Sequence, residues 1–122
     1  MPKIYWMSGY NVREGKHNEF RNWLNSKSFK QLCAEVEKET GMRYVETYFR
    51  ILPSSRGVED YDAYDFWELP NHAAMDKIRN SQATARLAET SYEFTEPKPS
   101  LSIVLRTARD VKIMFEPKKG QK

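Results

Sequence analysis

A chain of 122 residues with 39% hydrophobic, 30% charged and 13% aromatic residues is typical of one globular domain and excludes an intrinsically disordered segment. The formal net charge of +3 includes three lysines after residue 116, so the preceding part of the chain is about neutral and gives no electrostatic indication of nucleic-acid binding. We therefore expect a single domain over residues 1–116 and a basic flexible tail over residues 117–122.

The single cysteine, Cys33, excludes an internal disulfide and fits a reducing compartment. Its place in the helical pattern predicts a small core residue rather than a nucleophile. No apolar run approaches the roughly 20 residues of a membrane span, and the N-terminus lacks a signal-peptide pattern. We expect a soluble, cytoplasmic protein without a membrane partner.

The N-terminal half predicts a strand followed by a broken helix. Residues 3–10 are rich in bulky strand-forming residues, and both the odd and the even positions carry apolar side chains, which predicts a strand covered on both faces. The apolar residues within 20–24 and those within 29–36 would lie on opposite sides of one continuous helix. This change of phase predicts a break over residues 25–27.

Two signals predict where the second helical piece begins and ends. Ser28 and Gln31 have the Ser-x-x-Gln spacing of a capping box, which predicts a helix start at Ser28. Gly41 is well placed as a left-handed cap after a helix that ends near residue 40.

The C-terminal half repeats this order of elements. Pro70 ends a strand, Asn71 can cap a helix that begins at His72, and Asn80-Ser81-Gln82 interrupts that helix. The predicted elements are strands at 42–52 and 61–69, a broken helix from 72 toward 92 that ends before 96–99, a strand at 101–106, and a short fifth strand or bent continuation at 111–115.

The resulting order, β-α-β-β-α-β, predicts an α+β, ferredoxin-like sandwich with broken helices. A shift of 55 residues superposes the two halves and places Asn25-Ser26 on Asn80-Ser81, which indicates an internal duplication. Two helices can cover only one face of such a sheet, and neither face of the predicted strands is polar. An exposed aromatic face would be a large apolar surface patch, so we expect a second copy to cover it in a two-fold homodimer or a larger assembly.

Residues 23–30 read Trp-Leu-Asn-Ser-Lys-Ser-Phe-Lys, and this Trp-Leu-x-Ser-x-x-Phe-Lys pattern is similar to one in the antibiotic-biosynthesis-monooxygenase and haem-degrading branches of the dimeric α/β-barrel superfamily. Together with the topology, the resemblance spans residues 3–115. It implies two ferredoxin-like sheets that face each other and close a barrel, with the helices outside. The superfamily includes cofactor-free monooxygenases, lactone isomerases, EthD-like proteins and stress-induced barrels, so the fold alone does not define an activity.

Neither a haem nor another cofactor is expected. The positions at which the haem-degrading branch carries a Trp and a His are Ile78 and Ala88 here. The two histidines fall on separate helices without a cysteine or carboxylate at ligand spacing, so we expect no metal site.

Asp65 is the sharpest candidate for a catalytic residue. It alternates with Ala63 and Trp67, so it should point where apolar groups point, and burial there would raise its pKa toward that of a general base. The 55-residue shift places Tyr10 at the equivalent point of the first half, where it could hydrogen-bond a phenol or carbonyl group together with Asp65. The alternative is a buried Asp65 that is satisfied by Arg43, Arg50 or a backbone amide.

The remaining candidates are two histidines and a group of aromatic residues. His72 is a second candidate for proton transfer, and His17 is a candidate ligand contact. Both begin helices at matching positions of the two halves, where the positive end of the helix favours a neutral imidazole. The alternative is a surface position beside a cap. The aromatic residues would either line a flat apolar pocket between sheet and helices or form plain core; they are Trp6, Tyr10, Tyr48, Trp67 and Tyr92.

The function expected from these patterns is the binding of a small apolar or aromatic molecule. If the protein is an enzyme, the resemblance implies cofactor-independent oxygenation or a proton-transfer isomerisation. The alternative is a non-enzymatic barrel, of the structural or stress-induced kind, whose aromatic surfaces serve folding and assembly.

Overall fold

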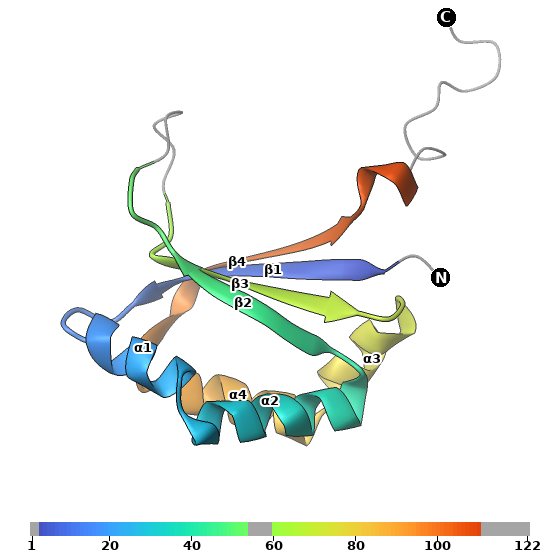
Figure 1. Ribbon diagram of the computed structural model, residues 1–122, viewed down its shortest axis with the longest axis horizontal. Helices are drawn as coiled ribbons and strands as arrows, with labels where there is room; N and C mark the ends of the chain where they lie inside the picture. Colours follow the sequence, from blue (N-terminus) through green and yellow to red (C-terminus); the bar gives the residue numbers. More distant parts are fainter. Residues whose placement is uncertain (1–2, 54–59, 111–122) are drawn as a thin grey trace, which may run out of the picture.

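The computed structural model describes residues 3–53 and 60–110, which form a four-stranded sheet and two helical arms (Figure 1). The predicted α+β, ferredoxin-like fold is confirmed. In chain order the elements are β1 Ile4–Val12, α1 His17–Leu24, α2 Lys27–Thr40, β2 Arg43–Phe49, β3 Ala63–Leu69, α3 Ala73–Arg79, α4 Gln82–Ser91, β4 Thr95–Arg106 and the short 3-10 helix η1 Ala108–Asp110.

The sheet is antiparallel, with the strand order β2-β3-β1-β4. The two central strands pair through Ser8 opposite Asp65 and Trp6 opposite Trp67. Because β2 and β4 are both edge strands, the sheet within one chain is open and does not close into a barrel.

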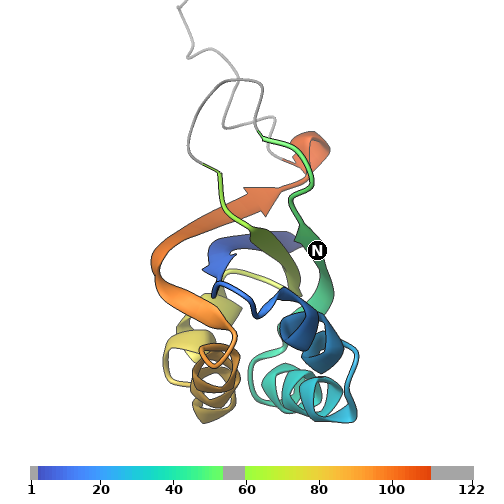
Figure 2. The ribbon, with the colours of Figure 1, turned by 90° about the vertical axis from the view of Figure 1, so that its left-hand side faces the viewer.

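All four helices lie on the same face of the sheet, and Figure 2 shows the α1–α2 and α3–α4 arms side by side beneath it. Successive side chains of a strand point to opposite faces, so each strand contributes one set of residues to the helix-covered face. On β1 this set includes Ile4, which is buried in the main core with Val36, Met42 and Leu69. A second, smaller cluster lies beneath α1 around Phe20.

Both predicted helix breaks are present, and each has the same cause. Ser26 has extended backbone angles, and its hydroxyl accepts a hydrogen bond from the Phe29 amide at 3.2 Å, so a new helix begins after it. In the second arm Ser81 accepts from the Thr84 amide at 3.0 Å in the same way. The prediction that Ser28 begins α2 is wrong, because Ser26 is the capping residue and Ser28 lies within the first turn.

The helix ends also depend on single residues. Gly41 has φ +84°, the left-handed conformation that was predicted for it after α2. The Asn71 side chain accepts a hydrogen bond from the Ala74 amide at 3.1 Å, which confirms Asn71 as the side-chain cap of α3. The helix itself begins at Ala73 rather than at His72.

The largest departure from prediction is at β4, which begins at Thr95 rather than near residue 101. Pro97 and Pro99 indicated a loop, but β4 is an edge strand, where a residue without an amide hydrogen need not interrupt the pairing. Thr95 lies opposite Val12 after an irregularity in the register. The predicted segment at 111–115 and the tail at 117–122 lie outside the described residues.

Replacing the capping serine tests this account of the first break. Ser26→Ala removes the acceptor for the Phe29 amide, and we expect a loss of about 1 kcal/mol in the free energy of unfolding, as for other N-cap serines. Ser28→Ala, at an exposed helical position two residues away, is the matched control and should be neutral or slightly stabilising. Urea unfolding of the two variants measures both effects; an equal loss in both would contradict the assignment of the cap.

Candidate functional site

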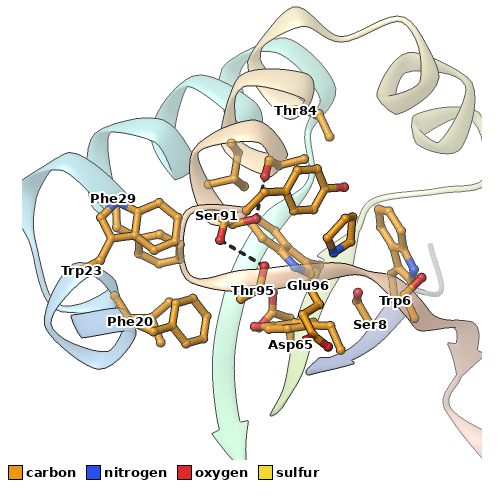
Figure 3. A pocket seen from close by; sticks show the side chains of 18 of the residues that line it. Trp6, Ser8, Phe20, Trp23, Phe29, Asp65, Thr84, Ser91, Thr95 and Glu96 are labelled. Carbon is orange, nitrogen blue, oxygen red and sulfur yellow. Dashed lines mark hydrogen bonds between the residues drawn. The ribbon is translucent and has the colours of Figure 1, made fainter. Parts of the chain in front are cut away.

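A cavity of about 240 Å³ lies between the helix-covered face of the sheet and the α1–α2 and α4 helices (Figure 3). Its size is sufficient for a small ligand, because an apolar cavity of roughly 150 Å³ is known to hold a benzene molecule. The side chains that line it come from β1, β3, β4, all three of these helices and the segments next to them; they are Trp6, Ser8, Tyr10, Phe20, Trp23, Leu24, Phe29, Met42, Asp65, Trp67, Thr84, Leu87, Ala88, Ser91, Tyr92, Thr95, Glu96, Pro97 and Ser100.

The walls of the cavity are aromatic. All three tryptophans of the chain line it, and ring contacts with their neighbours hold Trp23 and Trp67 in place. The ring of Trp23 lies 4.9 Å from that of Phe29 and 6.0 Å from that of Phe20, measured between centroids. The indole nitrogen of Trp6 donates to Ser102 Oγ at 3.0 Å, so this polar end is satisfied by the sheet.

Asp65 lies on the central strand β3 and is the only acid that the sheet's central strands contribute to the cavity. Its Oδ1 accepts hydrogen bonds from the Tyr10 hydroxyl at 2.5 Å and from the Thr47 hydroxyl at 2.7 Å. Neither predicted arginine reaches it, because Arg43 pairs with Glu68 and Arg50 with Asp62. Asp65 is therefore held by two neutral hydroxyls rather than by a cation.

Burial in this apolar setting raises the pKa of Asp65 from 3.8 to about 6. Hydrogen bonds from the side chains of Tyr10, Thr47 and Trp67 stabilise the ionised form and oppose this rise. Burial and the neighbouring carboxylate of Asp65 raise the pKa of Tyr10, so its hydroxyl stays protonated and acts as a donor. A carboxylate with a pKa near 6 can both hold and release a proton close to neutral pH.

Five of the residues predicted from the sequence are brought together at this cavity, namely Trp6, Tyr10, Asp65, Trp67 and Tyr92. Four of them lie on the helix-covered face of the central strands, two on β1 and two on β3. Tyr92 follows α4 and is 41% exposed, which places it at the margin of the cavity.

The other three predicted residues do not line the cavity. Tyr48 lies on the opposite face of the sheet, where its ring meets Phe66 edge-on and 55% of its surface is exposed. His17 is exposed at the start of α1, with Nε2 4.0 Å from an oxygen of Asp62. His72 is exposed beside α3 and accepts a hydrogen bond from the Arg106 guanidinium at 2.8 Å.

Thr47 and Glu96 are among the polar residues at or beside the cavity that were not predicted. Thr47 faces Asp65 because a bulge between Tyr44 and Glu46 reverses the alternation along β2, and no sequence signal marked the bulge. Glu96 lines the cavity because β4 begins early; in the sequence it belonged to a segment predicted to end a helix. Their absence from the prediction therefore has a structural cause in each case.

Cys33 is partly buried beside a second, shallower hollow between α2 and β2. Burial raises the pKa of its thiol to about 12, so the thiol stays protonated at neutral pH and is a poor nucleophile. Among the residues that the structure describes, no group of three or more His, Cys, Asp or Glu side chains is arranged to hold a metal ion. None of the described helices has the length and apolarity needed to cross a bilayer.

Comparison with solved structures agrees on the fold. A dimeric protein of unknown function from Bacteroides fragilis superposes with a TM-score of 0.57 at 13% identity over 86% of this chain and 96% of its own. A conserved protein from Methanosarcina mazei gives 0.57 at 21% identity over 88% and 94%. A variant of SnoaB, a cofactor-independent oxygenase from Streptomyces nogalater, gives 0.52 at 15% identity over 89% and 95%.

No protein-family model and no curated protein matches the sequence. At these identities the structural likenesses show the fold alone, which is a single-sheet, ferredoxin-like α+β domain. The cavity adds the second part of the description, which is a ligand-sized, mostly apolar space lined by two acids, Asp65 and Glu96.

The raised pKa of Asp65 has a consequence for stability that can be measured. A folded-state pKa of about 6 against 3.8 means that the folded protein binds more protons than the unfolded chain between these values, so stability falls as the pH rises through this window. The loss is at most about 3 kcal/mol by neutral pH for a shift of this size.

Asp65→Asn keeps an acceptor for Tyr10 and Thr47 but cannot ionise, so it should be spared this loss. We expect the free energy of unfolding of Asp65→Asn, relative to the wild type, to increase between pH 4 and pH 7. Urea unfolding at several pH values gives the difference, and a difference that stays flat or falls with pH would contradict the raised pKa.

Proposed function

We propose that the protein binds a small aromatic molecule in this cavity and acts as a homodimer. The observation that carries the proposal is the aromatic enclosure of about 240 Å³, which the acid Asp65 lines from the central strand β3. Binding sites for small molecules combine mostly apolar walls with a few polar groups that fix the ligand's orientation. Ser8, Tyr10 and Asp65 are such groups on the sheet side of this cavity.

If the protein is an enzyme, Asp65 is our candidate for the general base. It would take a proton from carbon or oxygen of a ligand that lies against the aromatic wall, while Tyr10 and Thr47 hold the carboxylate in place. Return of that proton to another atom of the ligand would complete an isomerisation.

Alternatively, the deprotonated ligand would react with dioxygen, with two hydrogens of a methylene replaced by one oxygen and the other oxygen leaving as water. The likeness of fold to the cofactor-independent oxygenase SnoaB supports this second route. His72 lies outside the cavity lining and has no part in either route. The rival proposal is a non-enzymatic barrel, which predicts that no ligand binds.

Asp65→Asn separates the enzymatic proposal from a purely binding role. Once a ligand that is turned over has been found, the variant should bind it but lose turnover, and wild-type kcat/KM should rise with pH around the Asp65 pKa of about 6, because only the ionised carboxylate accepts a proton. Steady-state kinetics across pH 5 to 8 would measure both effects. Turnover that survives in Asp65→Asn would rule out Asp65 as the base.

The binding proposal is tested by filling the cavity. Ala88 on α4 lines it, so Ala88→Phe should place a ring in the space and abolish saturable binding of small aromatic ligands. Ala85→Phe, on the exposed side of the same helix, is the matched control and should leave binding unchanged. Because Trp6, Trp23 and Trp67 all line the cavity, tryptophan fluorescence and the melting temperature report on binding directly. If no compound of a broad aromatic panel binds the wild type, the result supports the non-enzymatic alternative.

The homodimer proposal is supported by the face of the sheet that the described helices leave uncovered. Met7 lies opposite Phe66 on one side and Ile103 on the other, and Gly9 lies between Tyr64 and Leu101. A methyl group on Gly9 would come within 3.1 Å of the Tyr64 ring, so the glycine lets this ring lie over β1. These apolar side chains form a continuous patch of the kind that a partner covers.

The described part of this patch supports a two-fold arrangement in which two sheets face each other, and one structural neighbour is itself described as dimeric. The single cysteine and the near-neutral body fit the cytoplasmic location that we propose for the dimer.

Phe66→Glu should break the dimer, because it would bury a carboxylate between two apolar sheets. We expect the wild type to have twice the chain mass of 14.4 kDa in light scattering at micromolar concentration, and Phe66→Glu to have the mass of one chain. Ala85→Glu, on the exposed side of α4, should remain dimeric. A wild type with the mass of one chain would overturn the homodimer.

A further inference from the structure

The charges that line the cavity are all negative. Asp65 enters from β3 and Glu96 from β4, and both are labelled in the lower part of Figure 3. Among the described residues, no lysine, arginine or histidine lines this space. Arg13 contacts one lining residue, since its Nε donates to the backbone carbonyl of Tyr92 at 2.9 Å, but Arg13 itself is not part of the lining.

Neither of these carboxylates is neutralised within the described part of the chain. The Asp65 carboxylate receives its hydrogen bonds from uncharged groups, and Glu96 has no ion pair there. Two other acids of the protein, Glu68 and Asp62, differ in this respect. Glu68 contacts Lys3 and Arg43 at 2.9 Å each, and Asp62 lies 3.7 Å from Arg50. The cavity therefore combines two uncompensated carboxyl groups with aromatic walls.

This combination favours one charge class of ligand. A protonated amine is attracted by carboxylates, and its positive charge is also stabilised by the faces of aromatic rings. A ligand carboxylate or phosphate would be brought close to like charges in a setting of low polarity, which is costly. Hydroxyls from Ser8, Thr95 and Ser100 serve either kind of polar group and do not discriminate.

We propose that the natural ligand is a compact aromatic amine, bound with its rings between the tryptophans and its ammonium group toward Asp65 and Glu96. The volume of about 240 Å³ limits it to one or two rings with a short side chain. This inference rests on the proposed binding function and adds the charge class of the ligand. It also assigns to Glu96 a role in specificity that is separate from the role of Asp65.

The experiment compares three naphthalene derivatives substituted at the same ring position: naphthylmethylamine, naphthylmethanol and naphthoic acid. Titration calorimetry on the full chain at neutral pH measures the three affinities. We expect the amine to bind more tightly than the acid by a factor of about ten or more, with the alcohol between them, because one ligand gains and the other loses from the two carboxylates.

Substitution of Glu96 then separates the effect of its charge on ligand binding from the effect of its size. Glu96→Gln should weaken binding of the amine about three- to tenfold and leave the alcohol unchanged, since the amide has the same size without the charge. Glu89→Gln, on an exposed position of α4, is the control for a general change in charge and should leave both affinities unchanged. A loss of amine binding that is equal in the two variants would overturn the role of Glu96.

The outcomes distinguish this inference from the function on which it rests. Tighter binding of the amine that depends on Glu96 supports both. If the acid binds as tightly as the amine, the charge class is wrong while the aromatic cavity stands as a binding site. If none of the three compounds binds the wild type and Ala88→Phe changes nothing, the proposed function fails and the inference fails with it.

Discussion

The structure depends on the break in each helical arm. A straight helix would turn the apolar residues of its two halves to opposite sides, and only one of these sides could reach the sheet. Ser26 and Ser81 each end one helical direction and cap the next, so that Phe20 of α1 and Phe29 of α2 are both buried on the same side. The four short helices can thereby cover one face of the sheet along its whole length (Figure 1).

Confining the helices to one face gives the two faces different roles. The covered face contains the core and the cavity, because large rings from strands and helices meet there without filling all of the space. The opposite face has an apolar centre around Met7 and Phe66 that no described helix covers. In the function that we propose, the ligand and the second copy therefore use different faces of the sheet.

Asp65 shows the energetic cost of placing a polar group in such a cavity. The carboxylate loses solvation, and the hydroxyls of Tyr10 and Thr47 recover only part of it, which is why its pKa lies above the ordinary range. An acid kept at a cost in stability is a candidate for a functional role. No cation lies in the described lining, and the ammonium group of the proposed ligand would supply one.

The sequence by itself determined the features that depend on short-range patterns. Periodicity predicted the order of elements and both helix breaks, and alternation along β3 placed Asp65 on the same face as Trp67. These features need only the local geometry of helices and strands, which repeats every 3.6 or 2 residues.

Tertiary structure decided the features that depend on how distant strands pair. The bulge in β2 turned Thr47 toward Asp65 and left Tyr48 on the other face, and the pairing of Thr95 with Val12 brought Glu96 to the cavity. The two histidines at matching sequence positions, His17 and His72, lie outside the cavity. Register and bulges are set by contacts between strands far apart in the chain, so a pattern within one segment does not contain them.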